Sequence, residues 1–228
     1  MKQSKLFYLL FPFIVMSIPW IYLVIVWNDL PATIPTHFGL SGKPDAYGPR
    51  DQIVIAPAIL TAIAIGVYFL LRNIYKIDPK RKYAATTSGI LSKLAMMIVL
   101  LLCAVLLLII YWSLHGKVEG LNILFCGISL IMAYIGNLMH SIKPNYFVGF
   151  RIPWTLENEE NWRKTHQLAS KIWFAGGIIL AITSLLVTNQ AIIFVFLSGI
   201  GVMVIIPAVY SYNLYRQAIK TTKEKQDL

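Results

Sequence analysis

Six long stretches of the 228-residue chain contain no aspartate, glutamate, lysine, arginine or histidine. A helix needs about 20 residues to cross about 30 Å of hydrocarbon, and each stretch is near that length. Because backbone groups in lipid must be bonded within their own segment, each stretch predicts a transmembrane helix. The sequence therefore predicts an all-α integral membrane protein. The six stretches are Leu6–Val26, Ile53–Leu71, Leu94–Trp112, Leu121–Met139, Ile172–Thr188 and Ala191–Tyr210.

The connections between the stretches predict three helical hairpins. Only Asn189 and Gln190 separate the last two stretches, which favours a tight helical hairpin, with one re-entrant element as the alternative. We expect residues 1–93 to form an N-terminal helical hairpin with a structured loop at 27–52 and a basic loop after it. We expect residues 94–228 to form a four-helix region with a polar loop at 140–171 and a basic tail.

Chemistry at membrane depth is scarce. The two cysteines, Cys103 and Cys126, lie in separate apolar stretches, which excludes a disulfide framework. Apart from tyrosine and these two cysteines, the uncharged segments contain no ionisable residue, whereas ion-coupled transporters usually place a carboxylate or a basic group there. The chain also lacks a phosphate-binding glycine loop, a CxxC pair and an HExxH motif. These absences predict a protein that is not an enzyme and that uses no metal or cofactor.

Acidic residues are few, with ten against twenty lysines and arginines. With the N-terminus inside, 17 of the basic residues lie on the cytoplasmic side, and only Lys43, Arg50 and Lys117 lie outside. The positive-inside rule therefore predicts that both termini are cytoplasmic. Basic residues beside membrane spans face anionic headgroups, so the expected partner is the lipid bilayer and direct nucleic-acid binding is not needed.

The segment Trp27–Gln52, WNDLPATIPTHFGLSGKPDAYGPRDQ, is the one large loop on the predicted extracellular side. Its frequent prolines and glycines predict successive turns with a fixed shape. His37, Asp45 and Asp51 allow a metal site, but their spacing fits no standard one; His37 and Asp45 can also be mutual hydrogen-bond partners or contacts to a ligand. The candidate ligand-binding residues are Pro35, His37, Phe38, Gly42, Pro44, Asp45 and Tyr47.

The segment 140–171 lies on the predicted cytoplasmic side. Pro144 and Pro153 favour an extended first half, and Gly149 allows a turn. Thr155 is a plausible helix N-cap, and three glutamates follow it in the first turn, where they favour the helix dipole. These glutamates are Glu157, Glu159 and Glu160.

The second half of this segment predicts an amphipathic helix. Glu159–Arg163 and Glu160–Lys164 are i, i+4 pairs in the favourable order. Spacing places Trp162, His166, Ala169 and Trp173 on one face. This pattern is typical of an interfacial helix that continues into the fifth span, and its tryptophans and arginine equally favour a partner-binding surface. The candidate residues are Asn145, Gly149, Arg151, Pro153, Trp154, Thr155, Glu160, Trp162, Arg163, Lys164 and His166.

Small residues and prolines predict how the helices pack. Close approach of helices is suggested at Ala62 with Gly66, at Gly176–Gly177, and at Gly199 with Gly201, although each of these residues could instead simply be tolerated in its helix. Kinks are expected at four prolines within the apolar stretches. These are Pro12, Pro19, Pro57 and Pro207.

The segment KPNYFVGFRIPWTLENEENWRKTHQLASK resembles the signature of the SdpI-like family of bacterial immunity membrane proteins. That signature has a Gly-x-Arg-Thr-Pro-Trp-Thr-Leu core, an acidic stretch and Trp-Arg-Lys-Thr-His; here Ile152 replaces the family threonine. The first loop is similar to the N-terminal domain often joined to this family, with the pattern LP…IPTHF…G.PD.YG. The matching residues there are Leu30, Pro31, Ile34, Pro35, Thr36, His37, Phe38, Gly42, Pro44, Asp45, Tyr47 and Gly48.

The resemblance implies a protein of the bacterial cell membrane that protects against, or senses, a membrane-active toxic peptide. It also implies two partners, a secreted peptide toxin outside and a cytoplasmic transcriptional repressor inside. The residues themselves leave two other functions open, a small-solute or lipid transporter and an intramembrane enzyme.

The basic-residue asymmetry gives a direct test of orientation. In a cysteine-free background, a cysteine at Ser41 should react with an impermeant thiol reagent in intact cells. A cysteine at Asn158 should react only after permeabilisation, because the predicted position of that residue is cytoplasmic. The opposite labelling pattern would exclude this topology.

Overall fold

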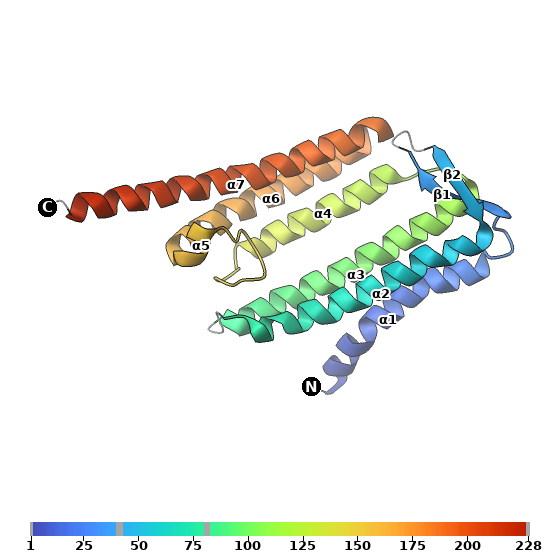
Figure 1. Cartoon of the computed structure of the whole chain (residues 1–228), viewed down its shortest axis with the longest axis horizontal. Helices are drawn as coiled ribbons and strands as arrows, with labels where there is room; N and C mark the ends of the chain where they lie inside the picture. The colour runs from blue at the N-terminus through green and yellow to red at the C-terminus, as the bar shows by residue number, and fades with distance from the viewer. Residues whose placement is uncertain (1, 40–42, 80–82, 227–228) are drawn as a thin grey trace. The chain divides into compact units, whose positions relative to one another are not determined.

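Six long helices dominate the computed structural model, which describes residues 2–39, 43–79 and 83–226 (Figure 1). Each is long and apolar enough to cross a membrane, and each covers most of one uncharged stretch. The prediction of an all-α membrane protein with six spans is therefore confirmed. The helices are α1 (Lys2–Ile25), α2 (Ile55–Asn73), α3 (Ala84–His115), α4 (Leu121–Met139), α6 (Glu159–Leu186) and α7 (Asn189–Gln226).

Shorter elements lie between these helices. The first loop contains two antiparallel strands, β1 (Thr33–Phe38) and β2 (Pro44–Pro49), followed by a 3₁₀ helix, η1 (Arg50–Val54). The sequence predicted turns here but not strands, because proline and glycine are usually depleted in sheets. An isolated two-stranded ribbon has two unpaired edges, where proline is tolerated. The remaining elements are η2 (Ile74–Ile77) and α5 (Pro153–Glu157).

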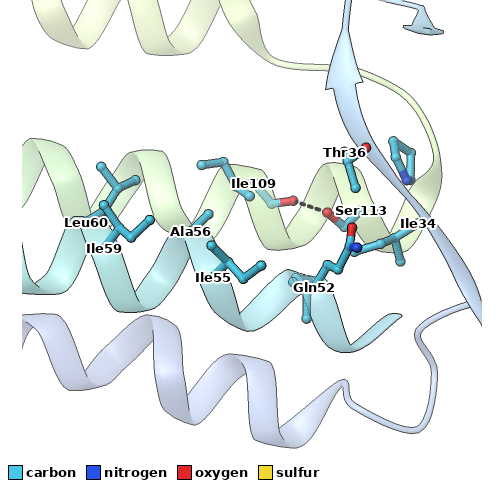
Figure 2. Close-up of a pocket in the computed structure, with 11 residues that line it drawn as sticks. Ile34, Thr36, Gln52, Ile55, Ala56, Ile59, Leu60, Ile109 and Ser113 are labelled. Carbon is cyan, nitrogen blue, oxygen red and sulfur yellow. Dashed lines mark hydrogen bonds between the residues drawn. The ribbon is translucent and has the colours of Figure 1, made fainter. Parts of the chain in front are cut away.

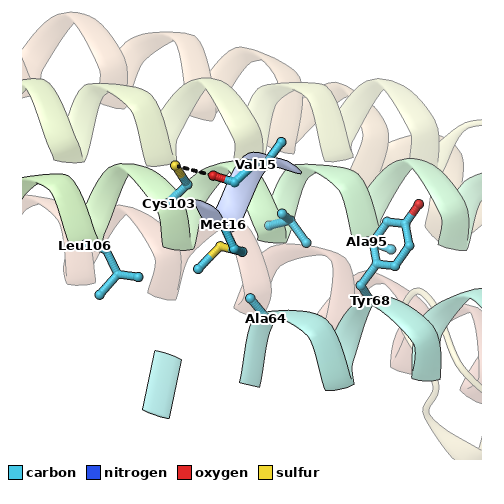
Figure 3. Close-up of a cluster of buried hydrophobic side chains, with 8 residues drawn as sticks. Val15, Met16, Ala64, Tyr68, Ala95, Cys103 and Leu106 are labelled. Carbon is cyan, nitrogen blue, oxygen red and sulfur yellow. Dashed lines mark hydrogen bonds between the residues drawn. The ribbon is translucent and has the colours of Figure 1, made fainter. Parts of the chain in front are cut away.

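The chain forms two compact units, and the first comprises Met1–Arg72, Ser92–Phe125 and Val187–Ile192. Its core packs α1, α2 and α3 against one another (Figure 3). The cluster combines small residues such as Ala64 and Ala95 with the larger Met16 and Tyr68, so the helices can approach closely there. The buried members are Val15, Met16, Ala64, Tyr68, Ala95, Val99, Cys103 and Leu106.

A second apolar cluster in this unit fixes the first loop to the ends of the helices. Leu30 and Ile34 are buried in the loop, with 4% and 2% of their surface exposed. They pack with Ile53 of η1 and Ile110 of α3. The loop is thus attached by its own apolar side chains, which agrees with the predicted fixed shape.

The second unit comprises Asn73–Leu91, Cys126–Leu186 and Ile193–Leu228. Here α6 packs antiparallel against both α4 and α7. A Cβ atom placed on Gly177 of α6 would lie 2.5 Å from the Ala133 nitrogen of α4, and one on Gly136 would lie 2.7 Å from the Trp173 carbonyl carbon. Only glycine allows these backbones to meet.

Glycine spacing was an incomplete guide to these contacts. Gly176 and Gly199 do lie at the contact of α6 with α7, where added Cβ atoms would crowd Met203 and Leu180. Gly66 has no other atom within 4 Å of an added Cβ among the described residues, and Gly201 has none either. The predicted close approaches at those two glycines were therefore wrong, while Gly136 was missed because no second small residue marks it four positions away.

Three prolines inside helices each free a carbonyl oxygen, and a side chain from another helix satisfies each one. Proline has no N–H, so the carbonyl four residues earlier loses its helical donor. Pro12 frees Tyr8, whose oxygen accepts a 2.7 Å hydrogen bond from the Tyr68 hydroxyl. Pro19 frees Val15, whose oxygen accepts a 3.4 Å bond from the Cys103 thiol (Figure 3).

The third case lies in the second unit. Pro207 of α7 frees the Met203 carbonyl, which accepts a 2.9 Å hydrogen bond from the Trp173 indole of α6. Pro57 differs because it lies in the first turn of α2, where its missing N–H has no helical acceptor to lose. No kink is thus required at Pro57, and bending at the other three prolines stays a prediction.

The pairing of Trp173 with the carbonyl freed by Pro207 can be tested by a double-mutant cycle. Trp173→Phe keeps an aromatic ring but removes the donor, and should lower the free energy of unfolding in detergent by about 1 kcal/mol. In a Pro207→Ala background the helix supplies its own N–H to Met203, so the same substitution should cost less than half as much. Equal costs in both backgrounds would contradict this role.

Candidate functional site

The first candidate site is the hairpin region, residues 27–54. Its strands pair Ile34 with Gly48 and Pro35 with Tyr47, and the register becomes irregular at His37. The loop is closed by a 3.0 Å hydrogen bond from the Gly39 amide to the Lys43 carbonyl. This irregularity changes the regular alternation of side chains, so His37 and a β2 carboxylate can meet.

His37 and Asp45 are hydrogen-bonded partners, as one of the sequence interpretations predicted. The His37 Nδ1 atom lies 2.5 Å from Asp45 Oδ1, and their side chains are 69% and 52% exposed. Asp51 lies apart from them at the start of η1. Within residues 2–39, 43–79 and 83–226, no group of three or more His, Cys, Asp or Glu side chains could hold a metal ion. The His37–Asp45 hydrogen bond joins β1 to β2 and so stabilises the hairpin, while both side chains stay accessible to solvent.

Aromatic contacts attach the hairpin to the helix ends. Phe38 packs edge-on against Trp112 of α3, with ring centroids 6.2 Å apart. The Arg50 guanidinium lies 5.1 Å from the Trp27 ring centroid and donates to the Trp27 carbonyl at 3.4 Å. The Trp112 indole donates to the Glu119 carbonyl at 2.7 Å, so the α3–α4 connection is also held.

That connection carries one ion pair. Lys117 Nζ lies 2.5 Å from Glu119 Oε1. The hydrogen bond and charge of Glu119 raise the pKa of Lys117, and those of Lys117 lower the pKa of Glu119. Both groups are fully ionised near neutral pH, so the pair adds no net charge to this end of the first unit.

A pocket of about 480 Å³ lies beneath β1, between α2 and α3 (Figure 2). Ile34 and Thr36 close it from the strand, and Gln52 reaches up from η1. Its wall is mainly aliphatic, and the Ser113 hydroxyl donates to the Ile109 carbonyl and not into the space. The remaining lining residues are Pro35, Ile53, Ile55, Ala56, Ile59 and Leu60.

The predicted ligand residues of the hairpin fall into separate groups. Pro35 is buried and lines the pocket, and Phe38 is partly buried against Trp112. Tyr47 is 62% exposed, and Pro44 is partly exposed. Gly42 lies outside the described residues, as does Ser41. Sequence reasoning named the loop but missed the pocket, because most of its wall comes from α2 and α3.

The second candidate site is the signature segment, residues 140–171. Its first turn is organised by Asn145, which is 1% exposed. The Asn145 Oδ1 atom accepts from the amides of Phe147 and Val148 at 2.8 and 2.7 Å, and Nδ2 donates to the carbonyls of Lys143 and Val148. A buried side chain so fully bonded fixes the shape of the turn.

Gly149 brings this turn onto His166. Its φ is +103°, which favours glycine, and a Cβ there would run into the His166 ring. The Phe150 amide donates to His166 Nε2 at 3.0 Å, and Nδ1 donates to the Trp162 carbonyl at 2.8 Å. The imidazole is thus neutral with both nitrogens used, since protonation would leave the Phe150 amide without an acceptor.

Trp162 completes this buried stack. Its ring lies 4.1 Å from that of His166 and nearly parallel to it, and its indole donates to the Ile142 carbonyl at 2.9 Å. Trp162, His166 and Ala169 are each no more than 1% exposed. Their predicted common face is therefore real but packs inside the protein. Placement of this helix at a membrane interface stays a prediction.

The predicted N-cap was wrong. Thr155 lies inside the short helix α5, where its hydroxyl accepts from the Ile152 amide at 3.0 Å and reaches the Phe150 carbonyl at 2.7 Å. The long helix α6 begins later, and its cap is Asn158, whose Oδ1 accepts from the amides of Glu160 and Asn161 at 2.9 Å. Pro153, which was expected to lie in an extended segment, is the first residue of α5, where proline suits the N1 position.

A buried polar network joins α5, α6 and α7. The Trp154 indole donates to Ser211 Oγ at 2.8 Å, and Ser211 donates to Asn161 Oδ1 at 2.7 Å. Asn161 returns a bond to the Ser211 carbonyl, and Thr165 donates to Asn161. Trp154 also stacks on Tyr215. Sequence reasoning missed Asn161 and Ser211, although two small polar residues on largely apolar helix faces are a signal for such a network.

The charged residues of the signature segment stay near the surface. Lys164 pairs with Glu160 at 2.9 Å, which confirms that predicted i, i+4 pair. Glu159 accepts from the Tyr83 hydroxyl at 3.2 Å, and the described residues show no ion pair between Glu159 and Arg163. The second predicted pair is thus not formed.

Arg151 is exposed and donates to the Tyr146 carbonyl at 2.7 Å. The N–H of the same residue, Tyr146, donates to the buried carboxylate of Asp78 at 3.3 Å, so a second segment also holds this turn. Arg151 therefore braces the turn while its side chain remains exposed.

These features define a multi-pass helical membrane protein with a strand-bearing loop near one end of a helical core and a buried aromatic–histidine stack in a connecting segment. Residues 141–211 match the model of the SdpI/YfhL protein family, and residues 14–61 match DUF1648, a domain of unknown function. The matches confirm the resemblance to the SdpI-like family that the motifs indicated. They cover the hairpin region, residues 27–54, and residues 141–171 of the signature segment.

One named relative agrees with this result. The chain is 26% identical over 205 residues to a Bacillus subtilis protein named Immunity protein SdpI, covering 90% of this chain and 94% of that protein. It is 40% identical over 48 residues to an uncharacterized protein of Archaeoglobus fulgidus, covering 21% of this chain and 26% of that protein. No solved structure matches the chain.

Gly149→Ala tests the buried stack. The added methyl group meets the His166 ring, and the backbone conformation there disfavours alanine. The free energy of unfolding should therefore fall by at least about 1–2 kcal/mol. Gly89→Ala is the matched control, because Gly89 lies in α3 and, among the described residues, no atom beyond the backbone of its own helix lies within 4 Å of an added Cβ. Thermal unfolding in detergent should separate the two variants, and equal stability would contradict the packing described.

Proposed function

We propose that this protein is a non-enzymatic membrane immunity protein that protects a bacterial cell against a membrane-active peptide. The observation that carries the proposal is the similarity to Immunity protein SdpI, which extends over 90% of this chain. The similarity also covers 94% of that protein, so it extends over nearly the whole length of both chains.

In this proposal the hairpin region lies outside the cell and the signature segment inside. The support is the placement of basic residues, because 17 of the 20 then lie on the cytoplasmic side. Both termini would be cytoplasmic. The hairpin region is then the large surface that an extracellular peptide can meet, since the other outer connections are short.

The hairpin region offers such a peptide two kinds of contact. His37, Asp45 and Tyr47 are exposed polar groups on one small ribbon. Below the ribbon, the aliphatic pocket at Pro35 suits an apolar side chain. A peptide that partitions into membranes carries both kinds of group, so its polar part would meet the ribbon and an aliphatic residue would enter the pocket.

The signature segment would transmit the binding of the peptide to a cytoplasmic repressor. Its buried members, such as Asn145, Thr155 and His166, serve as scaffold because their polar atoms are already bonded within the chain. Arg151, Pro153 and Arg163 are exposed and supply the surface that a protein partner could contact.

Filling the pocket tests recognition at the hairpin. Ala56→Phe places a ring in the pocket, whereas Ala58→Phe adds the same ring to an exposed position on the same helix. We expect Ala56→Phe to lower the peptide concentration that kills cells about tenfold, which corresponds to ~1.4 kcal/mol of lost contact. His37→Ala or Asp45→Ala should weaken protection in the same direction, and Ala58→Phe should not.

Survival must be compared at equal protein levels, measured by immunoblot of membranes. Full protection by Ala56→Phe, His37→Ala and Asp45→Ala together would move recognition away from the hairpin region. Absence of any protection by the wild-type chain against a panel of membrane-active peptides would remove the immunity proposal itself.

A further inference from the structure

A small pocket of about 120 Å³ lies beside the Trp162–His166 stack in the second unit. Its volume is about one quarter of that of the pocket beneath β1, so it suits a single small polar group. Its rim contains His140, Lys143 and Arg163.

The stack itself has no polar atom left for a ligand. The Trp162 indole is bonded to Ile142, and both His166 nitrogens are bonded to backbone groups. It therefore acts as a rigid aromatic wall. Recognition of a ligand depends on the basic side chains at the rim.

Positive charge exceeds negative charge at this rim. Lys143 and Arg163 are exposed, and neither forms an ion pair in the described part of the chain. Among the described residues that line the pocket, Glu159 is the one carboxylate, and it already accepts a hydrogen bond from the Tyr83 hydroxyl. Two permanent cations against one engaged carboxylate favour an anion.

The pocket lies at the boundary of the apolar spans. His140 directly follows the last residue of α4, and Arg163 lies in the second turn of α6, before the apolar stretch that begins at Ile172. Lipid phosphates are found at this depth, whichever side of the membrane this end occupies. The planar guanidinium of Arg163 can donate two parallel hydrogen bonds to one phosphate.

We propose that this pocket binds a phosphate group, held by Lys143 and Arg163 against the Trp162–His166 wall. The group belongs either to an anionic phospholipid headgroup or to free phosphate, because both present the same oxygens. The proposal does not depend on immunity function.

The test uses the full chain purified in a neutral detergent. Its thermal unfolding is followed while short-chain phosphatidylglycerol, phosphatidylcholine or inorganic phosphate is added at constant ionic strength. We expect a saturable stabilisation by phosphatidylglycerol, by inorganic phosphate, or by both, and the responding probe identifies the source. No saturable effect from either probe would overturn the proposal.

Three variants test whether the phosphate group binds at this pocket. Arg163→Gln should weaken the apparent affinity roughly ten- to a hundredfold, the loss expected for one charge-assisted contact. Lys171→Gln removes the same charge from an exposed position outside the pocket and should change affinity less than twofold. Glu159→Gln keeps an acceptor for Tyr83 but removes the competing charge, and should tighten binding.

Arg163→Gln should weaken phosphate affinity and Glu159→Gln should strengthen it. Both substitutions alter surface residues of the same helix, so opposite changes in affinity separate a binding site from a structural role. Equal weakening by Arg163→Gln and Lys171→Gln would show general attraction to a basic surface and would overturn the assignment.

Discussion

The constraint on which this structure depends is that a carbonyl oxygen in hydrocarbon must find a donor. Three prolines inside the spanning helices each leave one carbonyl without its helical N–H donor, and in each case a side chain of another helix donates the hydrogen bond instead. Tyr68, Cys103 and Trp173 are therefore more than apolar filling, because each joins two helices through a backbone atom. The positions of these helices are specified by polar contacts within an otherwise apolar core.

Much of the fold could be predicted because the membrane limits the possible structures. An uncharged run of about 20 residues has few alternatives to a helix, and all six were found. The hairpin was missed because strand formation at Thr33–Phe38 depends on pairing and on anchoring by Ile34, which local composition does not record. The boundary of α6 was misplaced because Thr155 and Asn158 are both good capping residues, and tertiary contacts decided between them.

The candidate sites were predicted only as segments. Motif residues such as Gly149, Trp162 and His166 were named, but their joint burial depends on how the turn at Asn145 folds back, which no residue spacing reveals. The pocket beneath β1 and the network through Ser211 combine residues far apart in sequence. A single sequence supplies the parts of such sites, whereas the fold decides which of them meet.

The proline contacts bear on how the chain enters the membrane. Tyr8 precedes its donor Tyr68 by 60 residues, and Val15 precedes Cys103 by 88. When α1 leaves the ribosome, the donors for its two freed carbonyls have not yet been synthesised. These two contacts can therefore form only after α2 and α3 have been made. In α7 the order is reversed, since Trp173 is already in place 30 residues before Met203.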